Sequence, residues 1–207
     1  MSKLKEFLQN ENGSASIMVI SLIALILCIS LMVVAVDYPM MVTKVKRIKH
    51  QLNSAVHAAS LSINEQRLAD GFLELDTTTA GINAKDMFFK YLRLSMRLDT
   101  TNKALSESYL PTGDDVIVHE LVYVDTSNGL VKNLKGGSTT CSYIAGKVTC
   151  NLVLNSSTPK PITRKVDEIV VGPSVVAVIQ AYHKGIGLLG SEPLVISAVQ
   201  EVEFRKK

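Results

Sequence analysis

The stretch SIMVISLIALILCISLMVVAVDYP, residues 16–39, decides how the rest of the chain is organised. No formal charge occurs between Asn12 and Val36. A transmembrane helix needs roughly 20 consecutive apolar residues, because each residue adds only about 1.5 Å along the helix axis. The run from Ile17 to Val36 reaches that length, so it predicts a helix that crosses a membrane once.

A secretory signal peptide that is removed after export is the alternative interpretation of this run. The small residues Val33-Val34-Ala35 could form its cleavage site. The apolar core of a signal peptide is usually only about 7–15 residues long, however. The length of the run therefore favours a span that is retained.

Composition limits the classes of function that the chain can have. The chain has 207 residues, of which 47% are hydrophobic, and a formal net charge of +3. About 170 residues follow the apolar run, enough for one domain with its own core. The small net charge, the low aromatic content of 5% and the absence of Trp predict no nucleic-acid partner.

A second helical pattern follows the apolar run without a clear break. Pro39 lacks an N–H and crowds the carbonyl of Ala35, yet the pattern resumes at once, so we expect a kink in the helix and not its end. Apolar and small residues then recur at spacings of three and four, which places them on one helix face. We expect an amphipathic stem helix over residues 39–70 whose small side chains let a partner backbone come close. The residues expected to pack are Leu52, Ala55, Ala59 and Ser62.

The remainder of the chain changes from helical to strand-like patterns. Asn83 is a plausible N-cap for a second helix over residues 84–98. After it come runs rich in β-branched residues, separated by turn signals. The expected strands are 116–124, 130–134, 139–144, 147–154, 162–171, 175–182 and 194–204. The predicted fold class is α+β, with a long N-terminal transmembrane and stem helix packed on an antiparallel, β-rich head.

Three cysteines occur, and two of them flank a candidate turn. Cys28 lies inside the apolar run, whereas Cys141 and Cys150 flank Ala145-Gly146. Across such a hairpin the two thiols could face each other on paired strands, and we predict a disulfide there. Two unrelated thiols remain the alternative. A disulfide would imply that the head lies in an oxidising compartment.

No pattern of catalytic or metal-binding residues emerges. His50 and His57 are two helical turns apart, and the chain has no HExxH and no GxSxG motif. The glycines near residues 185–190 do not follow the order of a phosphate-binding loop. We therefore expect a protein that is not an enzyme, with no catalytic residues, no metal site and no cofactor.

The charges that flank the span give an ambiguous orientation. Lys44, Lys46, Arg47 and Lys49 follow the span, whereas only Lys3 and Lys5 precede it. The positive-inside rule would place the C-terminal side in the cytoplasm. The cysteine pair and the strand region rich in Ser, Thr and Asn favour the opposite side. The residues alone leave these two orientations open.

The N-terminal layout resembles that of type IV pilin-like proteins, and most closely the TadE/TadG-like pseudopilins of Tad/Flp pilus systems. The resemblance lies in NGSASIMVISLIAL at residues 12–25, VAVDY at 34–38 and HQLNSAVHAASLS at 50–62. Asp37 takes the place of the Asp that follows the span in this family. The last stretch resembles the family's Ala-rich helix. The resemblance covers residues 12–62 and nothing beyond them.

The resemblance implies a single-pass protein of the cytoplasmic membrane with its N-terminus inside and its C-terminal domain outside. It implies processing between Gly13 and Ser14, because the peptidase that cleaves this class cuts after a glycine. The class usually has Glu five residues after that glycine, where this chain has Met18. This departure implies a minor or accessory component. The implied partners are the membrane and other pilin-like subunits or assembly-platform proteins.

These inferences together give an expected organisation. Residues 1–13 form a cytoplasmic leader, 14–38 a transmembrane helix, 39–70 the stem helix and 71–207 an extracytoplasmic α+β head. The expected function is that of a membrane-anchored pseudopilin, or accessory structural component, of a Tad/Flp-type pilus or related secretion apparatus. The alternative is a single-span membrane protein whose external domain binds a ligand or another protein.

Overall fold

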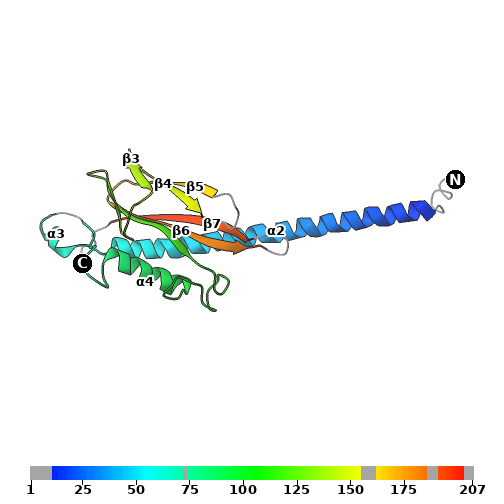
Figure 1. Ribbon diagram of the computed structural model, residues 1–207, viewed down its shortest axis with the longest axis horizontal. Helices are drawn as coiled ribbons and strands as arrows, with labels where there is room; N and C mark the ends of the chain where they lie inside the picture. The colour runs from blue at the N-terminus through cyan, green and yellow to red at the C-terminus, as the bar shows by residue number, and fades with distance from the viewer. Residues whose placement is uncertain (1–10, 72–73, 155–161, 186–190, 203–207) are drawn as a thin grey trace. The chain divides into compact units, whose positions relative to one another are not determined.

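The computed structural model describes residues 11–71, 74–154, 162–185 and 191–202 (Figure 1). These residues form two compact units, with the boundary on the first helix between Thr43 and Lys44. The second unit runs from Lys44 to Lys184 and resumes at Ser191. Helices and antiparallel sheets are both present, which confirms the α+β class. Most of the predicted leader, residues 1–10, lies outside the described residues.

The first helix, α2, extends from Glu11 to Ser60 and contains Pro39 in its interior. Its charge-free part belongs to the first unit and its last part, from Lys44, to the second. The helix continues beyond the proline as expected. The Thr43 hydroxyl donates a hydrogen bond to the Pro39 carbonyl at 2.9 Å.

The expected stem helix over residues 39–70 is wrong beyond Ser60. There the chain leaves the helix and pairs with a later segment: Asp76 N donates to Ser62 O at 2.8 Å and Asn64 N to Glu74 O at 2.9 Å. A separate short helix, α3, covers Glu65–Ala69 and is capped by the Asn64 side chain, which accepts from Gln66 N and Arg67 N. Ser62 consequently lies outside the helix and is only half-buried.

The second predicted helix is present as α4, Ala84–Met96, and Asn83 is its N-cap as predicted. The Asn83 side chain accepts from Asp86 N at 2.8 Å, and its amide donates back to Asp86 Oδ2 at 2.9 Å. The first bond gives a partner to one backbone N–H that a helix start otherwise leaves without one, and the second holds the Asn83 side chain in place. The buried side chains recur every four residues and so share one face: Ala84, Phe88, Leu92 and Met96.

Seven described strands form two antiparallel sheets. They are β1 (Ile117–Asp125), β2 (Leu130–Asn133), β3 (Cys141–Ile144), β4 (Lys147–Leu154), β5 (Ile162–Ile169), β6 (Ser174–Lys184) and β7 (Ser191–Glu201). One sheet has the order β2-β1-β6-β7 and the other β3-β4-β5. Residues 174–181 of β6 are all buried. A strand covered on both faces has no solvent-facing positions, which explains the nearly continuous apolar run of β6.

The second unit contains three layers. Alternate residues of β1 and β6, such as Val122 and Val176, point into a core shared with the smaller sheet. The residues between them, such as Leu121 and Ala177, have no exposed surface either. They therefore face the opposite side of the sheet, where the last turns of α2 and the helix α4 lie (Figure 1). The order of layers is helices, larger sheet, smaller sheet.

The small-residue face of α2 is closed to solvent. Leu52, Ala55 and Ala59 each have 0% exposed surface, as do Ile48 and Val56. An alanine with no exposed surface at the centre of a helix contact leaves no room for a longer side chain. The small size of the alanines therefore lets the helix closely approach the elements that it contacts.

We predict that Ala59→Leu destabilises the second unit by about 1–3 kcal/mol, because three added heavy atoms overpack a filled contact. Urea unfolding of a fragment that begins at Lys44 would measure the change. Asn53→Leu is the matched control, since Asn53 is exposed on the same helix and both substitutions introduce a good helix former. Equal midpoints for the two variants would contradict a closely packed face at Ala59.

Candidate functional site

The N-terminal part of α2 presents an apolar surface. Most large side chains between Ile17 and Val36 are more than half exposed, with Met18 at 75% and Leu31 at 69%. Within the described residues, α2 is the helix long and apolar enough to cross a membrane. A helix satisfies its own backbone hydrogen bonds, so such a segment can be transferred from water into hydrocarbon without orphaned polar groups.

Both ends of this apolar segment carry residues that the sequence singled out. Gly13 and Ser14, the predicted processing site, lie in the first turn of α2. Asp37 follows the segment directly and is only 8% exposed. Exposed apolar side chains continue beyond Asp37 as far as Met40, which is 54% exposed.

Two polar side chains of α2 bind the rest of the second unit. Lys49 donates from Nζ to the carbonyl of Ser197 on β7, and its Nζ lies 3.8 Å from Glu168 Oε1 on β5. Gln51 Nε2 donates to Ser95 O on α4 at 2.9 Å. Lys49 thus joins the helix to one strand of each sheet. Sequence periodicity missed this role, because lysines on the flank of an apolar stripe ordinarily face solvent.

Cys141 and Cys150 form a disulfide, which confirms the sequence prediction. The two residues are directly opposite each other on β3 and β4, with their Cα atoms 3.9 Å apart. Ala145 and Gly146 form the two-residue turn between these strands, with φ values of 50° and 79°. Positive φ at both positions is the signature of the type I′ hairpin turn, which gives the strands the correct twist and register.

A buried carboxylate that sequence reasoning did not identify joins β1 to the segment that leads into β3. Glu120 on β1 is 5% exposed. Its Oε1 accepts from Thr140 N at 3.0 Å and from Thr140 Oγ1 at 2.8 Å, and its Oε2 accepts from Thr139 Oγ1 at 2.9 Å. The register of β1 against β6 shifts between Val118 and Glu120. Strand alternation alone does not reveal this bulge.

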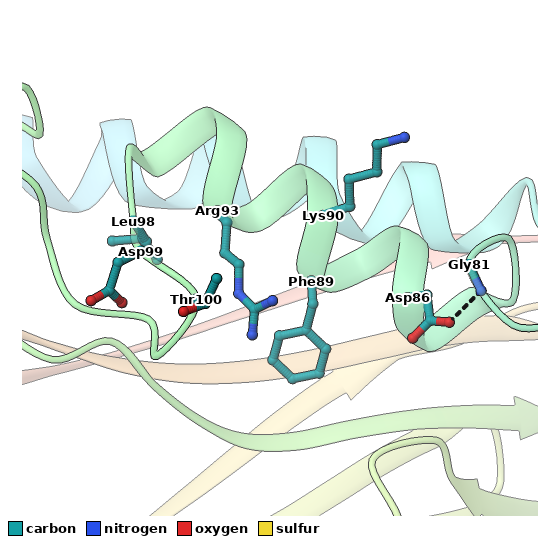
Figure 2. A pocket seen from close by; sticks show the side chains of 8 residues that line it. All are labelled: Gly81, Asp86, Phe89, Lys90, Arg93, Leu98, Asp99 and Thr100. Carbon is teal, nitrogen blue, oxygen red and sulfur yellow. Dashed lines mark hydrogen bonds between the residues drawn. The ribbon is translucent and has the colours of Figure 1, made fainter.

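An open hollow of about 710 Å³ lies beside α4 (Figure 2). Arg93 lies over the ring of Phe89, 5.3 Å from its centroid, and donates from Nε to Asn102 Oδ1 at 2.9 Å. The backbone N–H of Lys103 and the hydroxyl of Thr101 donate to Asp99 and lower the pKa of its carboxyl group. The polar side chains around this hollow therefore mainly hold the turn that follows α4.

Another acidic side chain holds the connection between α2 and α4. Hydrogen bonds from Thr79 and Thr78 lower the pKa of Asp76 to about 2. The backbone N–H of Thr78 donates to its Oδ1 at 2.8 Å and that of Thr79 at 3.0 Å. The carboxylate is therefore ionised at neutral pH and serves the local turn.

The His, Cys, Asp and Glu side chains of the described residues are the candidate metal ligands. Within residues 11–71, 74–154, 162–185 and 191–202, no group of three or more His, Cys, Asp or Glu side chains is placed to hold a metal ion. His50 is exposed and His57 is half-buried, and the two remain two turns apart on α2. The features of the described residues that point to a function are the apolar segment and the packed stem.

Comparison of the chain with protein-family models, with curated proteins and with solved structures gave no match.

We predict that reduction of the Cys141–Cys150 disulfide lowers the stability of the second unit by about 2–3 kcal/mol, from the loop entropy that the bond removes from the unfolded chain. Denaturant unfolding with and without dithiothreitol would measure the change. The double variant Cys141→Ala/Cys150→Ala is the control, and its midpoint should not respond to the reductant. A wild-type midpoint that is unchanged by dithiothreitol would show that the bond contributes nothing to stability.

Proposed function

We propose that the protein is a membrane-anchored, pseudopilin-like structural component of a Tad/Flp-type pilus or related secretion apparatus. In this proposal the apolar segment of α2 anchors the chain in the cytoplasmic membrane and associates with the corresponding segments of other subunits. The second unit is the head, which α2 supports through its small-residue face. The protein acts by packing and carries out no chemical reaction.

The observation that carries the proposal is that α2 has an exposed apolar part and a buried part rich in alanine. Its first part exposes apolar side chains over the length of a bilayer, and its last part buries alanines in the second unit. Each exposed Leu or Ile is disfavoured in water by roughly 1.5–3 kcal/mol relative to a buried one. An apolar segment of this size requires cover, and lipid or neighbouring helices of the same kind supply it.

The sequence resemblance supports the same proposal. A glycine precedes the apolar segment, Asp37 follows it and an Ala-rich helix comes next. Met18, where Glu is usual, favours a minor or accessory subunit over a main one. The usual Glu pairs with the N-terminus of a neighbouring subunit, and a methionine has no charge with which to do so.

The disulfide supports an orientation with the head outside the cytoplasm. Structural disulfides persist in oxidising compartments and are rare in the cytoplasm. Lys44, Lys46 and Arg47 argue for the reverse orientation by the positive-inside rule. We give the disulfide more weight, because the bond is built into the core between the two sheets.

We predict that the head is accessible from outside the cytoplasmic membrane. A cysteine introduced at the exposed residue Thr112, in a Cys28→Ser background, should react with a membrane-impermeant maleimide on intact spheroplasts. A cysteine at Ser14, which remains on the chain whether or not the leader is removed, is the control and should react only after the membrane is permeabilised. The opposite labelling pattern would invert the proposed orientation.

We also predict that the apolar segments of different subunits contact one another in the bilayer. Single cysteines at Ala24, Leu25, Ile26 and Leu27, again in the Cys28→Ser background, cover one full helical turn. Mild oxidation of membranes should cross-link at least one of these variants to another chain. The Cys28→Ser parent should give no cross-link. If none of the four positions cross-links, the single-span binding protein becomes the better interpretation.

A further inference from the structure

A basic surface on α2 lies outside the roles already assigned to the helix. We define the basic belt as Lys44, Lys46 and Arg47. Residues 38–64 contain no Asp or Glu, so no acidic side chain of this part of the helix offsets the charge of the belt. An uncompensated cluster of cations on a helix attracts anions from solution or from a surface.

Within the described residues, the belt lacks an ion pair of the kind that occupies its neighbour Lys49. Its charge acts on the side chain of Tyr109, whose pKa is raised by burial and lowered to a smaller extent by Arg47. Lys46 and Arg47 are exposed, whereas Lys44 is half-buried and lies one helical turn before the fully buried Ile48 on the same side of the helix. Lys46 and Arg47 therefore form the solvent-facing part of the belt. Lys49 binds Ser197 and Glu168 instead. Neither Lys46 nor Arg47 forms an ion pair with any described residue. Other cations of the second unit are paired, for example Arg67 with Glu74 and Lys147 with Asp167.

The position of the belt along the chain indicates which anion it meets. Met40, 54% exposed, is the last strongly exposed apolar side chain of the helix before the belt. Lys44 follows it four residues later, which corresponds to about 6 Å of helix rise. The polar headgroup layer on each side of a bilayer is of similar thickness. Long basic side chains also place their charged ends toward the interface while their stems cover apolar surface.

We propose that the basic belt binds the phosphate groups of anionic phospholipids in the leaflet where the helix leaves the hydrocarbon. Arg47 can donate two parallel hydrogen bonds to a phosphate diester, and Lys44 and Lys46 contribute point charges. The inference rests on the membrane anchoring in the proposed function. It does not depend on the orientation of the head or on assembly, because headgroups lie beside the belt in either orientation.

The test uses the full-length protein in a non-ionic detergent. Native mass spectrometry would compare the retention of phosphatidylglycerol with that of phosphatidylcholine as each lipid is titrated into the micelles. Wild type should retain phosphatidylglycerol preferentially, and added salt should weaken the preference. In Lys46→Gln/Arg47→Gln the apparent affinity for phosphatidylglycerol should fall roughly thirtyfold, given the contribution of each of the two cations near an anionic surface.

The matched control is Lys85→Gln/Lys90→Gln. It removes the same charge from two exposed positions of α4 and should retain wild-type lipid binding. Equal loss in both double variants, or equal retention of the two lipids by wild type, would overturn the proposal. Displacement of the lipid by an equal concentration of inorganic phosphate would also overturn it, because the site would then bind free phosphate.

Failure of the proposed anchoring has a different readout. Carbonate extraction of membranes that contain the full chain would release a protein that does not span the bilayer. The belt variant and its α4 control both leave the apolar segment unchanged, so they should resist extraction as wild type does. Loss of lipid selectivity without release would identify the belt alone as the defect.

Discussion

The close contact of α2 with the second unit is the constraint on which the rest of this structure depends. Ala55 and Ala59 have no exposed surface, so the helix approaches its neighbours at the distance that an alanine permits. Larger residues on the same face, Ile48 and Leu52, fill the space toward the start of the contact. Lys49 and Gln51 at its margins bind main-chain carbonyls of β7 and α4, which fixes the rotation of the helix about its axis.

Patterns that depend on neighbouring residues were predictable from the sequence. The spacing of Leu52, Ala55 and Ala59 indicated the buried face, and Asn83 marked the start of α4. Ala145-Gly146 indicated a hairpin, and the equal distances of Cys141 and Cys150 from that turn indicated that they pair. Each of these features follows from helix periodicity, capping or turn geometry, which act over a few residues of chain.

Features that depend on distant partners were not predictable in this way. The spacing of apolar residues continues to Ser62, but the helix ends at Ser60 because residues 62–64 pair with residues 74–76. The role of Lys49 requires Ser197, which is far away in the sequence. The separation of the strands into two sheets, and the burial of Glu120, arise from pairings that no local pattern encodes.

The smaller sheet explains why a disulfide is useful in this fold. β4 alternates between buried positions and more exposed ones, and β5 has no fully buried position, so the sheet buries one face only. Its buried residues join Val122 and Val176 in the core between the sheets, where Cys150 is 1% exposed. A three-stranded sheet with one covered face has little apolar area with which to offset the entropy of ordering its strands. The disulfide lowers the conformational entropy of the unfolded chain, so less entropy is lost when the strands become ordered. Glu120 fixes the segment that leads into β3. The larger sheet, covered on both faces, has no comparable need, and β6 at its centre contains no cysteine.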